Sequence, residues 1–225
     1  MSAKLCYASS TKEPRWTRYA RTPFDGGDVD NITDQHPSIP EAKRKRERYR
    51  TIWISDVHLG TRGCNAAMLI DFLDSTDSDT MYLVGDIIDG WRMQKKFYWP
   101  ATHNDIVWRV MKRAKRGTRV VYILGKPYWS LSKHAKHKVK NAVEFIGQFE
   151  QVVAHEAAAR HIDGVVCGHI HTAEMRDIAG ITYYNDGDWV EGCTALVEHF
   201  DGRMEILHWA DVQKARRRGN LSLAA

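Results

Sequence analysis

The chain has 225 residues, of which 43% are hydrophobic and eight are tryptophan, and its formal net charge is +5. This length and apolar content can bury one sizeable core, which excludes an intrinsically disordered protein. The sequence contains no stretch with the length and hydrophobicity of a signal peptide or a membrane span, and its four cysteines lack paired spacing. We therefore expect a protein of the reducing cytoplasm, neither secreted nor inserted in a membrane.

Residues 1–48 contain four prolines, a Gly26-Gly27 pair and no sustained hydrophobic period, which predicts a flexible basic extension. Basic runs at 43–50 and 214–218 flank a predicted domain over residues 49–209, and residues 210–225 are expected to form a basic tail. Such runs could contact nucleic acid or an anionic membrane surface, although they are more often solvated charged surface, and nucleic acid is the less expected partner.

The hydrophobic patterns predict alternating strands and helices within this domain. Strands are expected from Thr51 and at 81–84, 119–124, 165, 182–185, 194–200 and 204–209, and helices at 65–73, 104–116 and 133–160. The first strand, helix and strand form a βαβ unit, whose strands pair in parallel. Loops at the carboxyl ends of parallel strands meet at one edge of a sheet, where α/β folds place their sites.

Three of the predicted strands end directly in acidic or histidine side chains. Asp56-Val57-His58 follows the run 51–55, Gly85-Asp86-Ile87-Ile88-Asp89 follows 81–84, and Gly168-His169-Ile170-His171 follows 164–167. Side chains two residues apart on an extended segment point the same way, so each pair can converge on one point. Mixed carboxylate and imidazole ligands suit divalent manganese, iron or zinc. The candidate metal ligands are Asp56, His58, Asp86, His169 and His171.

In this order and strand context, the three motifs resemble those of calcineurin-like metallophosphoesterases. The segments 127–132, 138–143 and 185–191 are similar to the branch of that superfamily related to UDP-2,3-diacylglucosamine hydrolase, which cleaves a pyrophosphate in lipid A synthesis. The resemblance covers about residues 51–209. It implies an α/β fold, a two-sheet sandwich flanked by helices, and hydrolysis of a phosphoester or pyrophosphate in a nucleotide-linked lipid. It also favours manganese as the ion and a location at the inner membrane face.

The chain departs from the family pattern after the strand at 119–123. The family would continue with Pro-Gly-Asn-His-Asp, whereas residues 124–128 read Leu-Gly-Lys-Pro-Tyr. By resemblance, an internal block holding part of the sheet and the cap is missing. One metal site, made of Asp56, His58, Asp86 and His171, is complete, and the second retains only Asp86 and His169. The resemblance gives Asp86 and His169 catalytic roles, and the half-built second site implies impaired activity.

Several residues near the motifs allow two interpretations. Asp89 is expected to orient a metal ligand or cap the turn that follows it, and direct coordination of the metal is the less favoured alternative. Asn104, with His103, could replace missing ligands, but its position favours an N-cap. In the lipid-linked relatives a basic helix contacts substrate phosphates, which makes Lys136 and Lys140 candidates for substrate binding, whereas a solvated basic helix explains them equally well. His134 and His137 could likewise supply a substitute ligand, although their lysine-rich setting favours an exposed face.

Two other functions compete with the enzyme. One is a truncated relative that binds one metal but turns nothing over. The other is a protein that binds nucleic acid or a membrane surface through its basic ends. Loss of strands from the sheet would also leave edges that could support oligomers.

Overall fold

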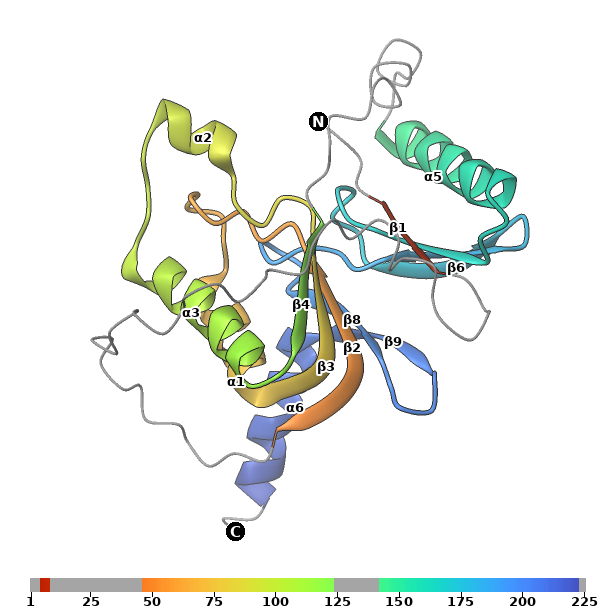
Figure 1. Ribbon diagram of the computed structural model, residues 1–225. Coiled ribbons are helices and arrows are strands. Elements are labelled where there is room, and N and C mark those ends of the chain that lie inside the picture. The colour runs from red at the N-terminus through yellow and green to blue at the C-terminus, as the bar shows by residue number, and fades with distance from the viewer. Residues whose placement is uncertain (1–4, 9–45, 124–141, 223–225) are drawn as a thin grey trace.

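In the computed structural model, two β-sheets lie between layers of helices (Figure 1). The structure describes residues 5–8, 46–123 and 142–222. The larger sheet has the strand order β4-β3-β2-β8-β9, and the smaller sheet has the order β1-β5-β7-β6. The strands are β1 (Leu5–Ala8), β2 (Glu47–Ser55), β3 (Thr76–Val84), β4 (Arg119–Ile123), β5 (Gly164–Cys167), β6 (Glu174–Ile178), β7 (Ile181–Asn185), β8 (Thr194–Glu198) and β9 (Met204–His208). The helices are α1 (Ala66–Ser75), α2 (Gly90–Lys95), α3 (Ala101–Lys115), α5 (Ala142–Ala159) and α6 (Trp209–Ser222).

Alternation along the strands divides the hydrophobic residues among three cores. On β3, Met81 and Leu83 pack in the core that contains residues of α1, α3 and α6, whereas Tyr82 and Val84 belong to a core shared with the smaller sheet. On β5, Val166 lies in that shared core while its neighbours pack with α5. The layers are therefore helix, sheet, sheet and helix, since side chains on a strand alternate between its faces. This arrangement confirms the expected α/β two-sheet sandwich flanked by helices.

The parallel pairing places the carboxyl ends of β2, β3 and β4 at one edge of the larger sheet. β2 pairs in parallel with β3, where Ser55 lies opposite Val84, and β3 pairs in parallel with β4, where Val84 lies opposite Ile123. The βαβ prediction is confirmed by this pairing. β8 runs antiparallel to β2, so its first residues lie at the same edge. The loops after β2 and β3 and the loop before β8 can therefore build a common site.

The ends of the chain differ from the prediction. Residues 5–8, inside the predicted extension, form β1 and pair antiparallel with β5, and β2 already begins at Glu47. Residues 210–222, within the predicted basic tail, form most of α6. Trp209 is fully buried, and its indole N–H donates to Asp71 on α1 at 2.9 Å, so the packed part of the chain extends past residue 209. Among the described residues, none of the helices combines the length and hydrophobicity that crossing a bilayer requires.

The start of α3 also differs from the prediction, because the helix begins at Ala101 with Pro100 at its N-cap. Asn104 therefore lies in the first turn, where its side chain accepts a hydrogen bond from the Trp99 indole at 2.7 Å, and the N-cap interpretation is wrong. His103 is buried and its Nδ1 accepts the Gly60 backbone N–H at 3.1 Å. It thus supports the loop that follows the first motif.

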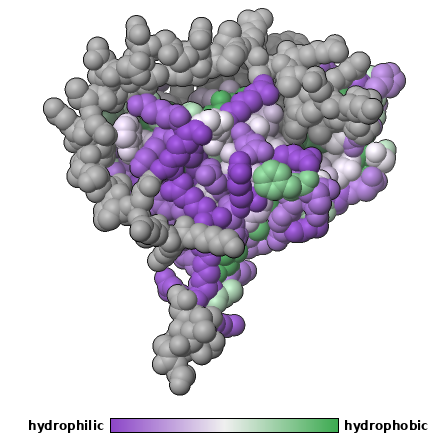
Figure 2. Space-filling model, turned by 60° about the horizontal axis from the view of Figure 1, so that its bottom comes forward, coloured by the Kyte–Doolittle hydropathy of each residue, from purple (hydrophilic) through white to green (hydrophobic). Residues whose placement is uncertain are grey.

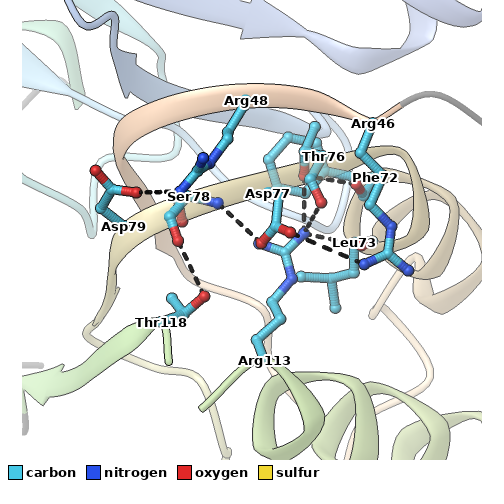
Figure 3. A network of polar contacts seen from close by, with 10 residues as sticks. All are labelled: Arg46, Arg48, Phe72, Leu73, Thr76, Asp77, Ser78, Asp79, Arg113 and Thr118. Atoms are coloured by element: carbon cyan, nitrogen blue, oxygen red, sulfur yellow. Dashed lines mark hydrogen bonds and ion pairs between the residues drawn. The ribbon is translucent and has the colours of Figure 1, made fainter. Parts of the chain in front are cut away.

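A buried arginine holds the junction between α1 and β3 (Figure 3). Arg113 of α3 is 2% exposed, and its Nη2 donates to the carbonyl oxygens of Leu73 and Thr76 at 2.8 and 2.6 Å and to the Thr76 hydroxyl at 2.9 Å. Burial lowers the pKa of Arg113 to about 10. Residues 76–80 are polar and gave no strand signal. They nevertheless pair with β2, next to the start of β3 that Arg113 holds.

Candidate metal centre

Asp56, His58 and His171 come together at the edge of the larger sheet. One ligand atom from each lies within 4.8 Å of the other two, and the two imidazole ring centroids are 5.5 Å apart. Asp56 is 2% exposed, whereas the side chains of His58 and His171 are 20% and 40% exposed. A carboxylate thus forms the floor of the group and two imidazoles open toward solvent. This donor set fits a divalent transition metal.

The backbone brings these side chains together in a way that differs from the expected extended segments. Asp56, His58, His169 and His171 have φ angles of 45°, 54°, 80° and 61°, all in the left-handed region. Non-glycine residues in that region cost about 1–3 kcal/mol of conformational energy each, and they cluster at functional sites. The conformation is held by neighbouring backbone: the His58 N–H donates to the Asp86 carbonyl at 2.8 Å, and the Trp189 N–H donates to the Asp56 carbonyl at 3.2 Å.

Asp56 is enclosed by the Gly168-His169 segment. Its Oδ2 accepts the backbone N–H of His169. A Cβ at Gly168 would lie 2.6 Å from the Ser55 hydroxyl oxygen and 2.7 Å from Asp56 Oδ2. The glycine is required because any side chain there would displace the carboxylate, and this close approach links the two sheets at the site.

Asp89 contacts His58 and caps a helix, so the cap interpretation is confirmed, while its role in orienting a metal ligand stays a prediction. Its Oδ2 lies 3.3 Å from His58 Nδ1, and its Oδ1 accepts the Arg92 backbone N–H at 3.0 Å at the start of α2. Arg92 Nε lies 3.7 Å from the same Oδ2. With Nδ1 facing a carboxylate, the free nitrogen of His58 for a cation is Nε2.

Asp86 and His169 adjoin the three grouped side chains without belonging to them. Burial lowers the pKa of His169, while the negative charges of Asp56 and Asp86 oppose that shift. Coordination and catalysis by Asp86 and His169 stay predictions. Lys136, Lys140, His134 and His137 lie outside the described residues, as does the segment that replaces the third family motif.

Asp186 is a buried acid below the site that the sequence analysis did not single out. It is fully buried, its Oδ1 accepts the Ser55 hydroxyl at 2.7 Å, and its Oδ2 has no hydrogen-bond partner among the described residues. Burial, reinforced by the charge of Asp56, raises the pKa of Asp186 well above its usual 3.8, against the opposing effect of the Ser55 bond. Its side chain is therefore expected to keep its proton in the folded protein at pH values where the unfolded chain has lost it.

Asp186→Asn should remove a pH dependence of stability. Because the folded pKa is raised, the wild type loses stability as pH rises from 3.8 toward that pKa, whereas the amide does not titrate. The free energy of unfolding of the variant minus that of the wild type should grow by up to about 1.4 kcal/mol per pH unit in this window. Urea unfolding of both proteins between pH 4.5 and 8 measures it. A difference that stays constant with pH would contradict the assignment.

No protein-family model matches the chain, and no curated protein matches it. Among solved structures, the chain is similar to protein TM1076 of Thermotoga maritima, with 17% identity, a TM-score of 0.39, and coverage of 71% of this chain and 99% of that one. It is also similar to a single mutant of Vps29 from Entamoeba histolytica, with 13% identity, a TM-score of 0.37, and coverage of 70% and 96%. The fold assignment therefore rests on the strands, helices and cores described above.

Proposed function

We propose that the chain is a metal-dependent phosphoesterase of the calcineurin-like type. The observation that carries this proposal is the group formed by Asp56, His58 and His171, whose ligand atoms lie within 4.8 Å of one another. A divalent cation held there would acidify a bound water and polarise a phosphoryl oxygen. Asp56 would supply the negative charge. Because the two imidazoles are partly exposed, coordination positions on their solvent side would remain for water and substrate. Manganese is the ion favoured by the sequence resemblance.

For the substrate we propose a pyrophosphate or phosphoester in a nucleotide-linked lipid, as in UDP-2,3-diacylglucosamine hydrolase of lipid A synthesis. Support comes from the resemblance of three segments, one of which, 185–191, lies under the metal group, where the Trp189 N–H bonds to the Asp56 carbonyl. Asp86 and His169 are proposed as further ligands and Lys136 and Lys140 as substrate contacts. If the second metal is absent, the rate should fall about a hundredfold or more below that of a two-metal enzyme.

Three described arginines of the basic ends favour this function over nucleic-acid binding. Arg48 pairs with Asp79 at 2.9 Å, Arg50 pairs with Glu198 at 3.1 Å, and Arg216 lies 3.5 Å from Glu47. Acidic partners from the same fold thus offset much of their charge. Figure 2 shows a face whose described residues are mainly hydrophilic, with a few separate hydrophobic ones. We propose a cytoplasmic protein. Its basic ends would make any contact with the inner membrane face, and its sheet edges would make any contact with a second copy.

The experiment combines metal analysis with hydrolysis of bis-p-nitrophenyl phosphate in added manganese. We expect bound metal and metal-dependent hydrolysis in the wild type, and loss of both in His171→Ala. The matched control is His155→Ala, which removes an exposed histidine from α5. Absence of bound metal in the wild type would overturn the proposal. Bound metal without metal-dependent hydrolysis would instead support a truncated relative that no longer turns over substrate.

A further inference from the structure

Asp188 is a buried carboxylate in the loop between β7 and β8, and its two oxygens have different surroundings. Its side chain is 3% exposed. Oδ1 accepts three backbone N–H groups, those of Val190, Glu191 and Gly192, at 2.7, 2.7 and 3.1 Å. Oδ2 lies 3.8 Å from His171 Nδ1. The loop therefore fixes one oxygen and directs the other toward an imidazole of the metal group.

The position of Asp188 relative to the metal group is set by backbone bonds on both sides. The next residue, Trp189, is fully buried, and it donates its N–H to the Asp56 carbonyl at 3.2 Å and accepts the Asn65 N–H at 2.8 Å. The Asp188 carbonyl accepts the Thr194 N–H at 3.1 Å, at the first residue of β8. The carboxylate is thus anchored to the loop that carries Asp56, whereas the His171 side chain, 40% exposed, has room to rotate.

We propose that Asp188 is a positioning residue that acts through His171, an inference that rests on the proposed metal site. A neutral imidazole carries its proton on one nitrogen only, and the partner of the other nitrogen selects which. A carboxylate facing Nδ1 favours the Nδ1–H tautomer and leaves the Nε2 lone pair for a cation. Asp89 has the same relation to His58, with Nδ1 and Oδ2 3.3 Å apart. The two imidazoles of the group are therefore oriented by two separate carboxylates.

The separation of 3.8 Å is longer than a hydrogen bond, so the His171 ring must turn slightly to reach Asp188. At 3.8 Å the negative charge of the carboxylate already favours a proton on Nδ1 in the metal-free protein, and we expect cation binding to complete the turn, because coordination through Nε2 and bonding through Nδ1 then support each other. Hydrogen bonds at such sites are commonly long before the ligand binds and shorten in the complex.

Asp188→Asn separates positioning from a merely structural role. The amide oxygen can still accept the three backbone N–H groups, so the loop keeps its bonds. The amide NH₂ then faces His171 Nδ1 and presents a donor where the wild type presents an acceptor. A donor there favours the Nε2–H tautomer, which cannot ligate a cation through Nε2. Asp201→Asn is the matched control, since Asp201 also accepts a backbone N–H, from Arg203 at 2.9 Å, but lies on the exposed turn between β8 and β9.

The test measures zinc affinity by calorimetry and the His171 imidazole ¹⁵N shifts of the metal-free full chain at pH 8. We expect a 10- to 100-fold loss of affinity in Asp188→Asn, as is typical for carboxylates behind metal-bound histidines. We also expect its His171 to change from Nδ1–H to Nε2–H, with neither change in Asp201→Asn.

Affinity within twofold of the wild type, or lost affinity with an unchanged tautomer, would overturn the inference. The wild-type shifts decide it even if the variant does not fold, because a predominant Nε2–H tautomer in the wild type contradicts it. If the wild type binds no zinc or manganese, the proposed function fails separately, while the tautomer comparison still tests the role of Asp188.

Discussion

Asp56→Asn should abolish cation binding and leave the fold intact. Asp56 supplies the carboxylate of the metal group and is 2% exposed. Because the position is buried, an exposed acidic side chain cannot reach the cation in its place. Asparagine tolerates the left-handed backbone at this position, where φ is 45°, and its amide oxygen can still accept the His169 N–H. The substitution therefore removes the ligand charge with little change in conformation. We expect the affinity for manganese or zinc to fall at least about a hundredfold.

Thermal and urea unfolding with and without cation measure this effect. A cation at 100 times its Kd stabilises the protein that binds it by about 2.7 kcal/mol, and this gain should fall to about 0.4 kcal/mol or less in Asp56→Asn. The metal-free variant should be no less stable than the metal-free wild type, because a buried carboxylate without its cation is itself costly. Asp211→Asn makes the same charge change at an exposed residue, whose Oδ1 lies 3.0 Å from Lys214 Nζ. If Asp56→Asn kept the cation-dependent gain, the assignment of the metal group would be wrong.

Arg113→Met should lower the free energy of unfolding by about 3 kcal/mol or more. The guanidinium is 2% exposed and its Nη2 serves three oxygens, two of them backbone carbonyls at the end of α1 and the start of β3. Methionine fills a similar volume but leaves these buried acceptors without that donor, and each unsatisfied group costs about 1–3 kcal/mol. Because β3 lies between β2 and β4, the loss should destabilise the whole larger sheet.

Arg109→Met, one helical turn earlier on α3, provides the comparison. Arg109 donates to both oxygens of Asp74 at 2.8 and 2.9 Å, but the Asp74 side chain is 48% exposed and water can replace the arginine. Its loss should therefore cost less than about 1 kcal/mol. Urea unfolding at neutral pH compares the two variants. Equal decreases in the free energy of unfolding would show that the buried carbonyl contacts of Arg113 stabilise the fold no more than the exposed ion pair of Arg109.

The parts of the fold that could be predicted are those with a strong hydrophobic signal. The apolar run 81–84 predicted a buried strand, and residues 65–73 predicted a helix that the structure places at Ala66–Ser75. The polar residues 76–80 and the charged β6 carried no such signal, because their strand conformation depends on pairing, with the distant β2 in the first case and with the following strand β7 in the second. Tertiary contacts decided these segments, as is usual for strands.

The candidate site could be predicted in part, because motifs at the ends of strands name the ligands without giving the backbone between them. The pairing of Asp56 with His58 and His171 followed from that reasoning, but the left-handed φ angles that bring them together did not. Asp186 and Asp188 lie in an irregular loop, where an acidic residue has no periodic signal of burial. Only the fold shows that burial raises the pKa of Asp186 and that Asp188 faces an imidazole.

The pairing of β1 with β5 changes how the basic N-terminal region can be studied. Removing residues 1–48 would be the obvious way to ask whether that region attracts nucleic acid or lipid. The same cut would also strip β1 from β5, leaving a row of unpaired backbone groups open to other chains. Self-association of the shortened protein could then be mistaken for a change in ligand binding. Neutralising the arginines and lysines one by one, with residues 5–8 retained, avoids that confusion.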